Sequence, residues 1–156
     1  MELIFDSTGL TSRGKGFTYD DVLLIPSKSD MRSRRDPDLK SFLTEKTEIE
    51  LPFISANMDT ITEAPMAIAM DQQGGFGIIH RFMTVKEQAD QIKQVAKAGA
   101  KIIGASIGVN GESQDRAHAT VEAGANILTI DIAHGHSVQM FETLAWLKKT
   151  YPHVEV

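Results

Sequence analysis

The stretch TVKEQADQIKQVAKAGAKIIGASIGV, residues 84–109, decides the fold class because it joins a complete helix to a buried strand. Apolar residues recur in its first part at three- and four-residue spacing, which predicts an amphipathic helix. Thr84 is placed as N-cap, Glu87 completes a capping box, and Gly99 follows the last turn. The run at 101–109 is short and not alternating, which predicts a strand buried on both faces. The predicted apolar face of the helix consists of Val85, Ala89, Ile92, Val95 and Ala96.

A glycine recurs at a fixed period along the chain. Gly74, Gly99 and Gly124 are 25 residues apart, and an apolar run follows each of them. Strands and helices that alternate at this spacing are joined by right-handed crossovers, which gives a parallel sheet covered by helices. The predicted strands are 51–55, 76–79, 101–109 and 126–133, with 153–156 as the start of a fifth. The other predicted helices are about 62–73, with Met66, Ile68, Ala69 and Met70 stacked along it, 112–123, and 137–149, with Met140, Leu144 and Leu147.

An α/β fold is therefore expected, and two architectures fit it. A (β/α)8 TIM barrel needs roughly 250 residues. This chain would then supply an N-terminal extension at 1–50 and about the first four βα units at 51–156, which is half a barrel. An open doubly wound sheet fits 156 residues without truncation. The regular period favours the barrel, and the length favours the open sheet.

The composition excludes several classes of function. With 42% hydrophobic residues, the 156-residue chain can build one globular core. A net charge of −5 gives no field that attracts nucleic acid, and no apolar stretch reaches the ~18 residues of a membrane span. The absence of cysteine excludes disulfides, thiolate metal sites and a thiol nucleophile from these residues. We expect a small-molecule or protein partner, no nucleic acid, no membrane, and a cytoplasmic location.

Polar side chains gather where the predicted strands end. In both architectures ligands bind at the carboxyl edge of the parallel strands, so we expect a ligand site there. Taken alone, SANMDT at 55–60 could equally be a turn in which Asp59 or Thr60 caps the next helix. The strand-end residues are Ser55, Asn57 and Asp59 after the first strand, His80 and Arg81 after the second, Asn110 after the third, and Asp131, His134 and His136 after the fourth.

The stretch DIAHGHS at 131–137 allows three interpretations. Its two histidines, with Asp131 and His80, could form a metal cluster, or they could be solvated loop residues. We favour a hydrogen-bonding role, because a carboxylate at a strand end can hold two ribose hydroxyls and Gly135 lets a ligand approach the backbone closely. No metal is expected.

Four stretches together resemble the IMP dehydrogenase and GMP reductase family. They occur in the family's order and are FTYDDVLLIPSKS (17–29), SANMDTITEAPMAIAM (55–70), GGFGIIHRF (74–82) and LTIDIAHGHS (128–137). Members of that family are (β/α)8 barrels, usually tetramers, which change C2 of a purine nucleotide with a nicotinamide cofactor. The resemblance therefore implies the TIM barrel, a homo-tetramer, and a purine mononucleotide, GMP or IMP, as partner.

The resemblance also implies roles for particular residues, carried over by position. Asp131 can accept two hydroxyl hydrogen bonds from the nicotinamide ribose, and the small Ala133 and Gly135 leave space for a ring. The implied substrate-binding residues are Ser55, Asn57 and Met58. The implied cofactor-binding residues are His80, Arg81, Asp131, Ile132, Ala133, His134 and Gly135.

The choice of family member depends on several stretches and on one connection. TITEAPMAIAM and GGFGIIH resemble the dehydrogenases more, whereas SRRDPDL (33–39), SANMDT and HRF (80–82) resemble the reductases more. Dehydrogenases of the family usually carry a regulatory insertion after the second helix, whereas VAKAGAK at 95–101 runs straight into the third strand. This favours a GMP reductase using NADPH, with an IMP dehydrogenase using NAD as the alternative. The family's nucleophilic cysteine lies in the second half of the barrel, so no catalytic residue is expected in this chain. A catalytically incomplete half-barrel that only binds or self-associates is the alternative of another class.

Overall fold

The computed structural model describes residues 17–156, which belong to two units that divide after Pro37. In the first unit a short 3₁₀ helix, η1 (Tyr19–Asp21), begins after Thr18. The backbone N–H and hydroxyl of Thr18 both donate to the Asp21 carboxylate, and these hydrogen bonds lower the pKa of Asp21. Asp36 closes a second turn by accepting hydrogen bonds from the backbone N–H groups of Arg32 and Ser33.

The second unit, Asp38–Val156, is an α/β structure with a parallel sheet. It opens with an antiparallel hairpin, formed by β1 (Ser41–Phe42) and β2 (Glu48–Ile49). The parallel strands are β3 (Ile54–Ser55), β4 (Phe76–Ile79), β5 (Gly104–Ile107) and β6 (Ile127–Ile130). The helices are α2 (Ala64–Gln72), α3 (Val85–Lys97), α4 (Ser113–Glu122) and α5 (Val138–Thr150). The prediction of an α/β fold is confirmed.

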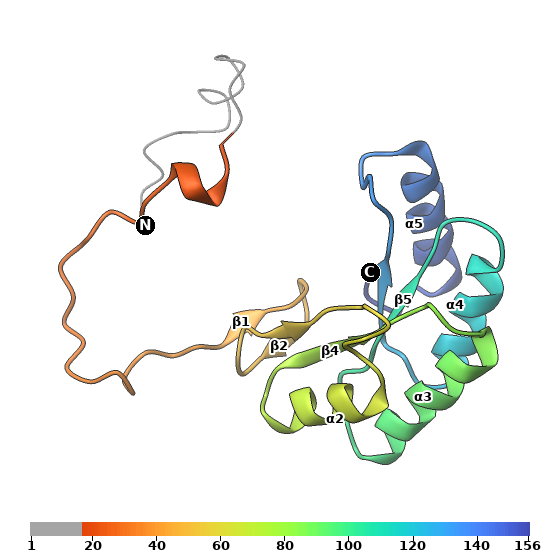
Figure 1. The fold of residues 1–156 in the computed structure, drawn as a ribbon, viewed down its shortest axis with the longest axis horizontal. Coiled ribbons are helices and arrows are strands. Elements are labelled where there is room, and N and C mark those ends of the chain that lie inside the picture. The colour runs from red at the N-terminus through yellow and green to blue at the C-terminus, as the bar shows by residue number, and fades with distance from the viewer. Residues whose placement is uncertain (1–16) are drawn as a thin grey trace. The chain divides into compact units, whose positions relative to one another are not determined.

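The parallel strands lie in chain order, β3-β4-β5-β6, and one helix joins each strand to the next. Helix α2 packs against α3 and α3 against α4, so these helices lie side by side over one face of the sheet (Figure 1). A doubly wound sheet instead reverses its strand order and carries helices on both faces. No reversal occurs among the strands of residues 38–156, and this order agrees with consecutive units of a barrel.

Helix α3 begins and ends as its sequence predicts. The Thr84 hydroxyl accepts a hydrogen bond from the Glu87 backbone N–H, and the Glu87 carboxylate accepts one from the Thr84 backbone N–H. The Thr84 hydroxyl also donates to this carboxylate and is the main reason that the pKa of Glu87 is lowered. Beyond the last turn, Gly99 has a φ of 93°, a conformation that glycine adopts without strain.

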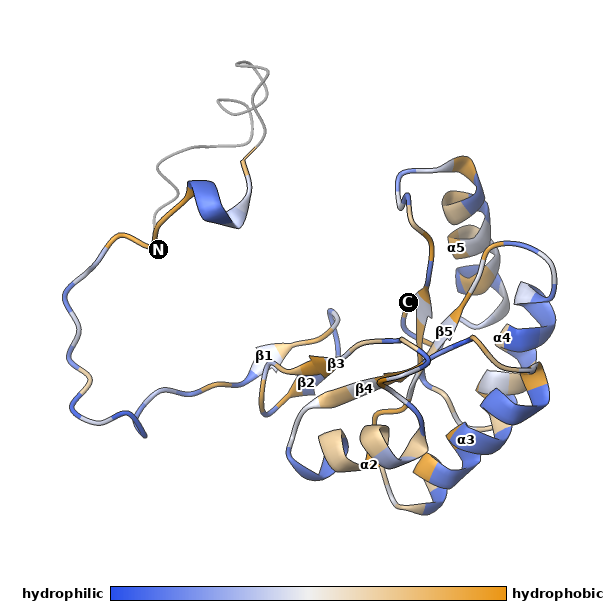
Figure 2. Ribbon diagram, in the orientation of Figure 1, coloured by the Kyte–Doolittle hydropathy of each residue, from blue (hydrophilic) through white to orange (hydrophobic). Residues whose placement is uncertain are grey.

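The core lies between the sheet and its helices, where Ile79, Ile107 and Leu128 of the strands are fully buried with Ile92 of α3. On the other face of the sheet, Ile49 of the hairpin packs with two strand residues, Phe76 and Ile127. The hairpin therefore covers the amino ends of the strands. In Figure 2, α3 is largely hydrophilic and α2 largely hydrophobic in colour.

Helix α2 differs from its prediction in both its start and its buried face. It begins at Ala64, with Pro65 in its first turn, and the fully buried Thr62 lies before it and accepts a hydrogen bond from the His80 backbone N–H. Ala64 and Ala67 are the buried residues, whereas Met66 is 40% exposed and Ala69 is exposed. A Cβ atom at Gly77 would lie 2.7 Å from the Cα of Ala67, so the helix backbone touches the strand here and leaves no room for methionine.

The predicted fifth strand at 153–156 is reduced to one parallel bridge, between Ile127 and Glu155. The strands predicted at 51–55, 101–109 and 126–133 are also shorter than predicted, because only the last two residues of the first run and the four residues of β5 and of β6 pair. The strand predicted at 76–79 has the predicted bounds. Among the described residues, no helix is both long and apolar enough to cross a membrane.

Candidate functional site

The carboxyl ends of the four parallel strands bring two of the predicted site residues into direct contact. Arg81 follows β4 and Asp131 follows β6, and the Nε atom of Arg81 lies 2.7 Å from Oδ2 of Asp131. The two side chains are 34% and 27% exposed, so the pair is accessible from solvent. A charge-assisted hydrogen bond of this length fixes the orientation of both groups.

Strand β5 lies between β4 and β6, so the arginine must pass over its end. The residue there is Gly108, and a Cβ atom at this position would lie 3.5 Å from Nη1 of Arg81. The absence of a side chain at Gly108 therefore leaves the path for the guanidinium group open. Among residues 17–156, the second carboxylate oxygen of Asp131 accepts no hydrogen bond, which leaves it free for a ligand hydroxyl.

His80 occupies a different environment from Arg81, its neighbour in the chain. Its ring is only 2% exposed, and Nδ1 accepts a hydrogen bond from the Phe82 backbone N–H. In the neutral ring the proton is therefore on Nε2, which is buried with no hydrogen-bond partner among the described residues. Oε1 of Glu63, the residue before α2, lies 3.5 Å from Nε2. His80 thus faces the start of α2.

The SANMDT turn (55–60) is closed by hydrogen bonds from the hydroxyl of Thr62, two residues beyond it. The Thr62 hydroxyl lies 2.9 Å from Oγ of Ser55 and 2.5 Å from the carbonyl oxygen of Ala56. The Ser55 hydroxyl also lies 3.2 Å from where a Gly77 Cβ atom would be, on the side of the sheet that faces α2. Asn57 is half-buried and Met58 is 50% exposed.

Neither Asp59 nor Thr60 caps α2. The N-cap residue is Glu63, which makes no capping hydrogen bond through its side chain. The backbone N–H of Ala64 instead donates to Oε1 of Gln91 on α3, 2.8 Å away.

The stretch after Asp131 is mostly exposed. Ala133, His134 and Gly135 are exposed and Ile132 is half-buried. The His136 ring lies edge-on to Phe141, with their centroids 5.4 Å apart, and Ser137 caps α5 by accepting a hydrogen bond from the backbone N–H of Met140. No group of three histidine, aspartate or glutamate side chains within 17–156 is placed to hold a metal ion.

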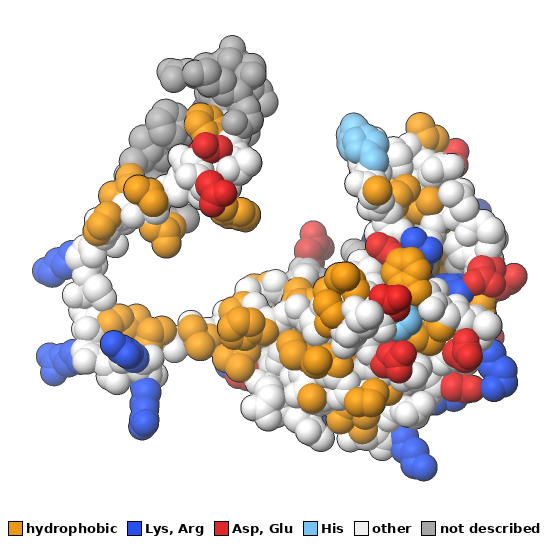
Figure 3. Space-filling view, in the orientation of Figure 1, with side chains coloured by type: hydrophobic (Ala, Val, Ile, Leu, Met, Phe, Trp, Pro, Cys, Tyr) orange, Lys and Arg blue, Asp and Glu red, His pale blue; other side chains and the backbone are white. Residues whose placement is uncertain are grey.

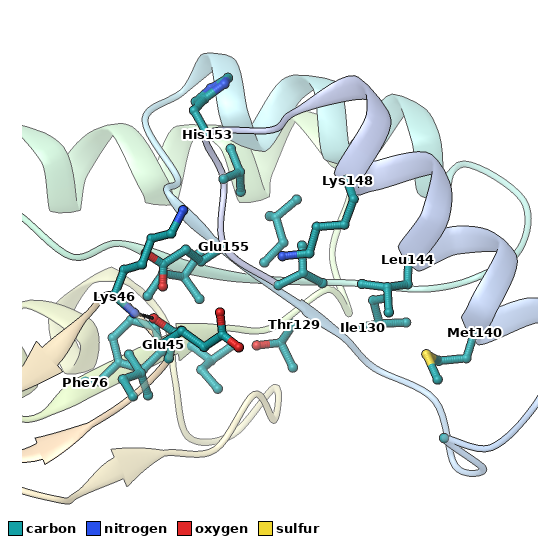
Figure 4. Close-up of a pocket in the computed structure, with 18 of the residues that line it drawn as sticks. Glu45, Lys46, Phe76, Thr129, Ile130, Met140, Leu144, Lys148, His153 and Glu155 are labelled. Carbon is teal, nitrogen blue, oxygen red and sulfur yellow. Dashed lines mark hydrogen bonds between the residues drawn. The ribbon is translucent and has the colours of Figure 1, made fainter.

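A groove of about 1010 Å³ lies beside β6 (Figure 4). Its lining comes from β6, from residues of β3 and β4, from the loop of the hairpin, from residues 152–156, and from Met140 and Leu144 of α5, which are only partly buried. It contacts the predicted cofactor stretch only at Ile132 and Gly135. Arg81 and Asp131 do not line it, so we place the candidate site at the strand ends and not in the groove.

Two buried residues of this region were not predicted from the sequence. Gln88 of α3 is fully buried, and Arg116 of α4 is 4% exposed. Gln88 stands four residues before Ile92, in line with the apolar face of the helix, and this placement was the only available signal. The side chains of Gln88 and Arg116 hydrogen-bond to each other and to the backbone carbonyl groups of residues 80, 83 and 106.

The fold and these contacts define an α/β domain in which a polar site lies at the carboxyl edge of a parallel sheet. The chain belongs to the IMP dehydrogenase / GMP reductase family, whose domain model matches residues 16–156. This confirms the resemblance deduced from the four sequence stretches.

Curated relatives of the chain carry the name of one of the two enzymes in this family's description. The inosine-5'-monophosphate dehydrogenase of Nitrosopumilus maritimus is 51% identical over 89 residues, which are 57% of this chain and 19% of that protein. The proteins of the same name from Halalkalibacterium halodurans and Bacillus subtilis are 49% and 48% identical over 89 residues, 57% of this chain and 18% of each protein. The matched part of the chain thus spans about a fifth of these relatives.

Proposed function

We propose that this chain is part of a purine-nucleotide oxidoreductase that acts at C2, and specifically of an IMP dehydrogenase that uses NAD. The observation that carries the proposal is the 48–51% identity to proteins named inosine-5'-monophosphate dehydrogenase. This reverses the preference for GMP reductase drawn from the sequence. In the proposed reaction IMP, water and NAD⁺ give XMP, NADH and a proton, and NAD⁺ supplies the hydride acceptor.

The strand-end geometry supports a cofactor role for Asp131. Its carboxylate is oriented by Arg81 through one oxygen, and its other oxygen is available to a ribose hydroxyl. Ala133 and Gly135, both exposed, present little side chain to a planar ring. We assign cofactor contacts to Arg81, Asp131 and residues 132–135, and a place near the cofactor to the buried His80.

Residues of the SANMDT turn are assigned to the purine nucleotide. Met58 is exposed and Asn57 half-exposed, so both can contact a ligand. The Ser55 hydroxyl would have to exchange its contact with Thr62 for one with the nucleotide. Because the 156 residues contain no cysteine, the proposal gives them binding roles and takes the thiol nucleophile from outside them.

GMP reductase is the second candidate, because one observation favours it. Helix α3 ends at Lys97 and β5 begins at Gly104, so no regulatory domain is inserted between them. In that reaction GMP, NADPH and two protons give IMP, NADP⁺ and ammonium.

The sequential strand order supports one proposal about architecture. We propose that the second unit forms consecutive βα units of a (β/α)8 barrel. We retain the homo-tetramer as a proposal based on the family.

The function is tested by assaying, with both substrate pairs, the whole protein to which this chain belongs, including the segment that supplies the thiol. We expect NADH to form from IMP and NAD⁺, and Asp131→Ala to raise the KM for NAD⁺ about tenfold, a loss of about 1.4 kcal/mol. If the protein consumes NADPH with GMP and forms no NADH from IMP and NAD⁺, GMP reductase replaces IMP dehydrogenase as the proposed function. An unchanged KM in Asp131→Ala would remove the role of this residue, and activity with neither pair would reject both candidates.

A further inference from the structure

A buried polar chain runs from α4 through α3 to the ends of β4 and β5. Arg116 of α4 donates from Nη1 to the side-chain oxygen of Gln88 at 3.0 Å. Gln88 of α3 donates from Nε2 to the carbonyl oxygens of His80, at 3.0 Å, and Ser106, at 2.9 Å. Both side chains are almost completely buried. We call Gln88 and Arg116 the clasp.

The orientation of the Gln88 amide is fixed by its partners. The guanidinium group can only donate, so the amide oxygen must face Arg116. The strand carbonyls can only accept, so the amide nitrogen must face β4 and β5. The amide oxygen of Gln88 is bound to a cation, and this polarises the amide. The N–H groups of Gln88 therefore become better donors to the carbonyl groups of the strands.

The clasp holds both ends of the segment that carries Arg81. Gln88 binds the carbonyl group of His80, and Nη2 of Arg116 binds the carbonyl oxygen of Met83 at 2.9 Å. Residues 80–83 are therefore fixed at their first and last carbonyl groups, with Arg81 between them. From this segment Arg81 reaches across Gly108 to Asp131.

Stability alone does not account for a buried cation in this position. The counter-ion of Arg116 is Glu112, whose side chain is 58% exposed, so the guanidinium group is desolvated beside a solvated partner. Apolar residues of similar volume often hold a core as well as such an arrangement. The clasp supplies directional hydrogen bonds to two strand ends, which apolar packing cannot supply.

We propose that Gln88 and Arg116 are positioning residues for the Arg81–Asp131 pair. By fixing residues 80–83 and the end of β5, they set the place from which Arg81 orients the Asp131 carboxylate toward the cofactor ribose. The inference rests on the proposed function for its kinetic consequence, whereas its structural consequence is independent of that function.

The kinetic test uses Gln88→Met in the whole protein that includes the thiol, with Gln94→Met as the matched control. Methionine keeps the length of the side chain and removes its hydrogen bonds, and Gln94 is an exposed residue of the same helix. We expect Gln88→Met to raise the KM for NAD⁺ about tenfold, with kcat and the KM for IMP within about twofold. In an Arg81→Met background the same substitution should have no further effect, because the clasp acts through Arg81. An equal increase of KM in that background would overturn the proposal.

The structural test measures backbone amide exchange of residues 80–84 by mass spectrometry. Gln88→Met and Arg116→Met should each make this segment exchange faster, whereas Gln94→Met should not. Unchanged exchange in both clasp variants would overturn the proposal whatever the enzyme does. If the unaltered whole protein does not use a nicotinamide dinucleotide, the proposed function fails, and the exchange rates still decide whether the clasp holds the segment.

Discussion

The contact between Arg81 and Asp131 depends on a side chain that is missing. Arg81 crosses the end of β5 at Gly108, where a Cβ atom would stand 3.5 Å from the guanidinium group. That distance is ordinary van der Waals contact, so one methyl group fits and a longer side chain does not. Gly108 therefore makes the contact possible without touching the ligand.

A pair of substitutions at Gly108 tests this. Gly108→Ala should leave cofactor affinity within about twofold, whereas Gly108→Leu should displace Arg81 and weaken affinity about tenfold, or about 1.4 kcal/mol. Isothermal titration of each variant with NAD⁺ measures the difference. Equal affinities in the alanine and leucine variants would show that the path over Gly108 does not matter.

The sequence predicts this site only up to a point. Residues that follow parallel strands meet at one edge, so the convergence of Arg81 and Asp131 could be predicted. Their pairing could not, because it depends on the length of the arginine side chain and on the glycine between the strands. The burial of His80 was also missed, since a histidine after a strand can face either the solvent or the helices.

At the scale of the elements, glycines set how closely neighbouring elements approach. A Cβ atom at Gly104 of β5 would lie 2.3 Å from the Phe76 ring and 2.9 Å from the Gly77 carbonyl oxygen. A backbone atom cannot move aside as a flexible side chain can. The Phe76 ring therefore fills the space that any side chain at position 104 would need.

Gly104→Ala should consequently reduce the free energy of unfolding by about 1–3 kcal/mol through overpacking. Gly135→Ala is the control, because nothing lies within 4 Å of a Cβ atom at that position. Urea denaturation followed by circular dichroism gives both values. A Gly104→Ala variant as stable as Gly135→Ala would contradict the close approach of Phe76.

The capping box of α3 predicts a dependence on pH. The Thr84 hydroxyl lowers the pKa of Glu87 from its ordinary value of 4.5. A carboxylate whose pKa is lowered by folding stabilises the native state above its ordinary pKa, and this contribution is lost as the pH falls through the lowered pKa. NMR titration should give a pKa below 4.5 for Glu87 in the unaltered chain and in Thr84→Ser, and a value closer to 4.5 in Thr84→Ala. An equally lowered pKa in Thr84→Ala would assign the shift to another group.

The bounds of a helix could be predicted where residues at its own ends determine them. Both ends of α3 follow from Thr84, Glu87 and Gly99, which act within the helix. The buried face of α2 does not, because it is chosen by the close approach of Ala67 to Gly77 on another element. Gln88 was missed for a related reason, since its partners are carbonyl groups of two strands.

At the scale of the whole sheet, β3 is an edge strand, and one of its sides pairs with no other strand of residues 17–156. Hydrophobic side chains are exposed in this region, and they gather over β1, β3 and α2 in Figure 3. They include Phe53 and Ile54, which are 65% and 51% exposed. An unpaired edge beside apolar side chains is a surface on which further strands can pair.

The isolated 156-residue chain should therefore self-associate. Light scattering should give a mass that rises with protein concentration, and Ile54→Lys should reduce this rise, because a charge on an edge strand opposes pairing. Gln94→Lys, at an exposed position of α3, is the control for the same change in net charge. A chain that stays monomeric at all concentrations would contradict this account of the edge.

The chain-order arrangement of the strands has a consequence for how the sheet is assembled. Each strand pairs with the one that precedes it, across a single crossover, so every step closes only a short loop and its entropic cost is small. During synthesis each unit can dock as it leaves the ribosome. One contact between the hairpin and the rest of the unit cannot form early. It is the hydrogen bond from the Thr47 hydroxyl to the Glu155 carboxylate, which joins residues 108 positions apart. The hairpin is thus secured at this end only after β3 to β6 have all been made.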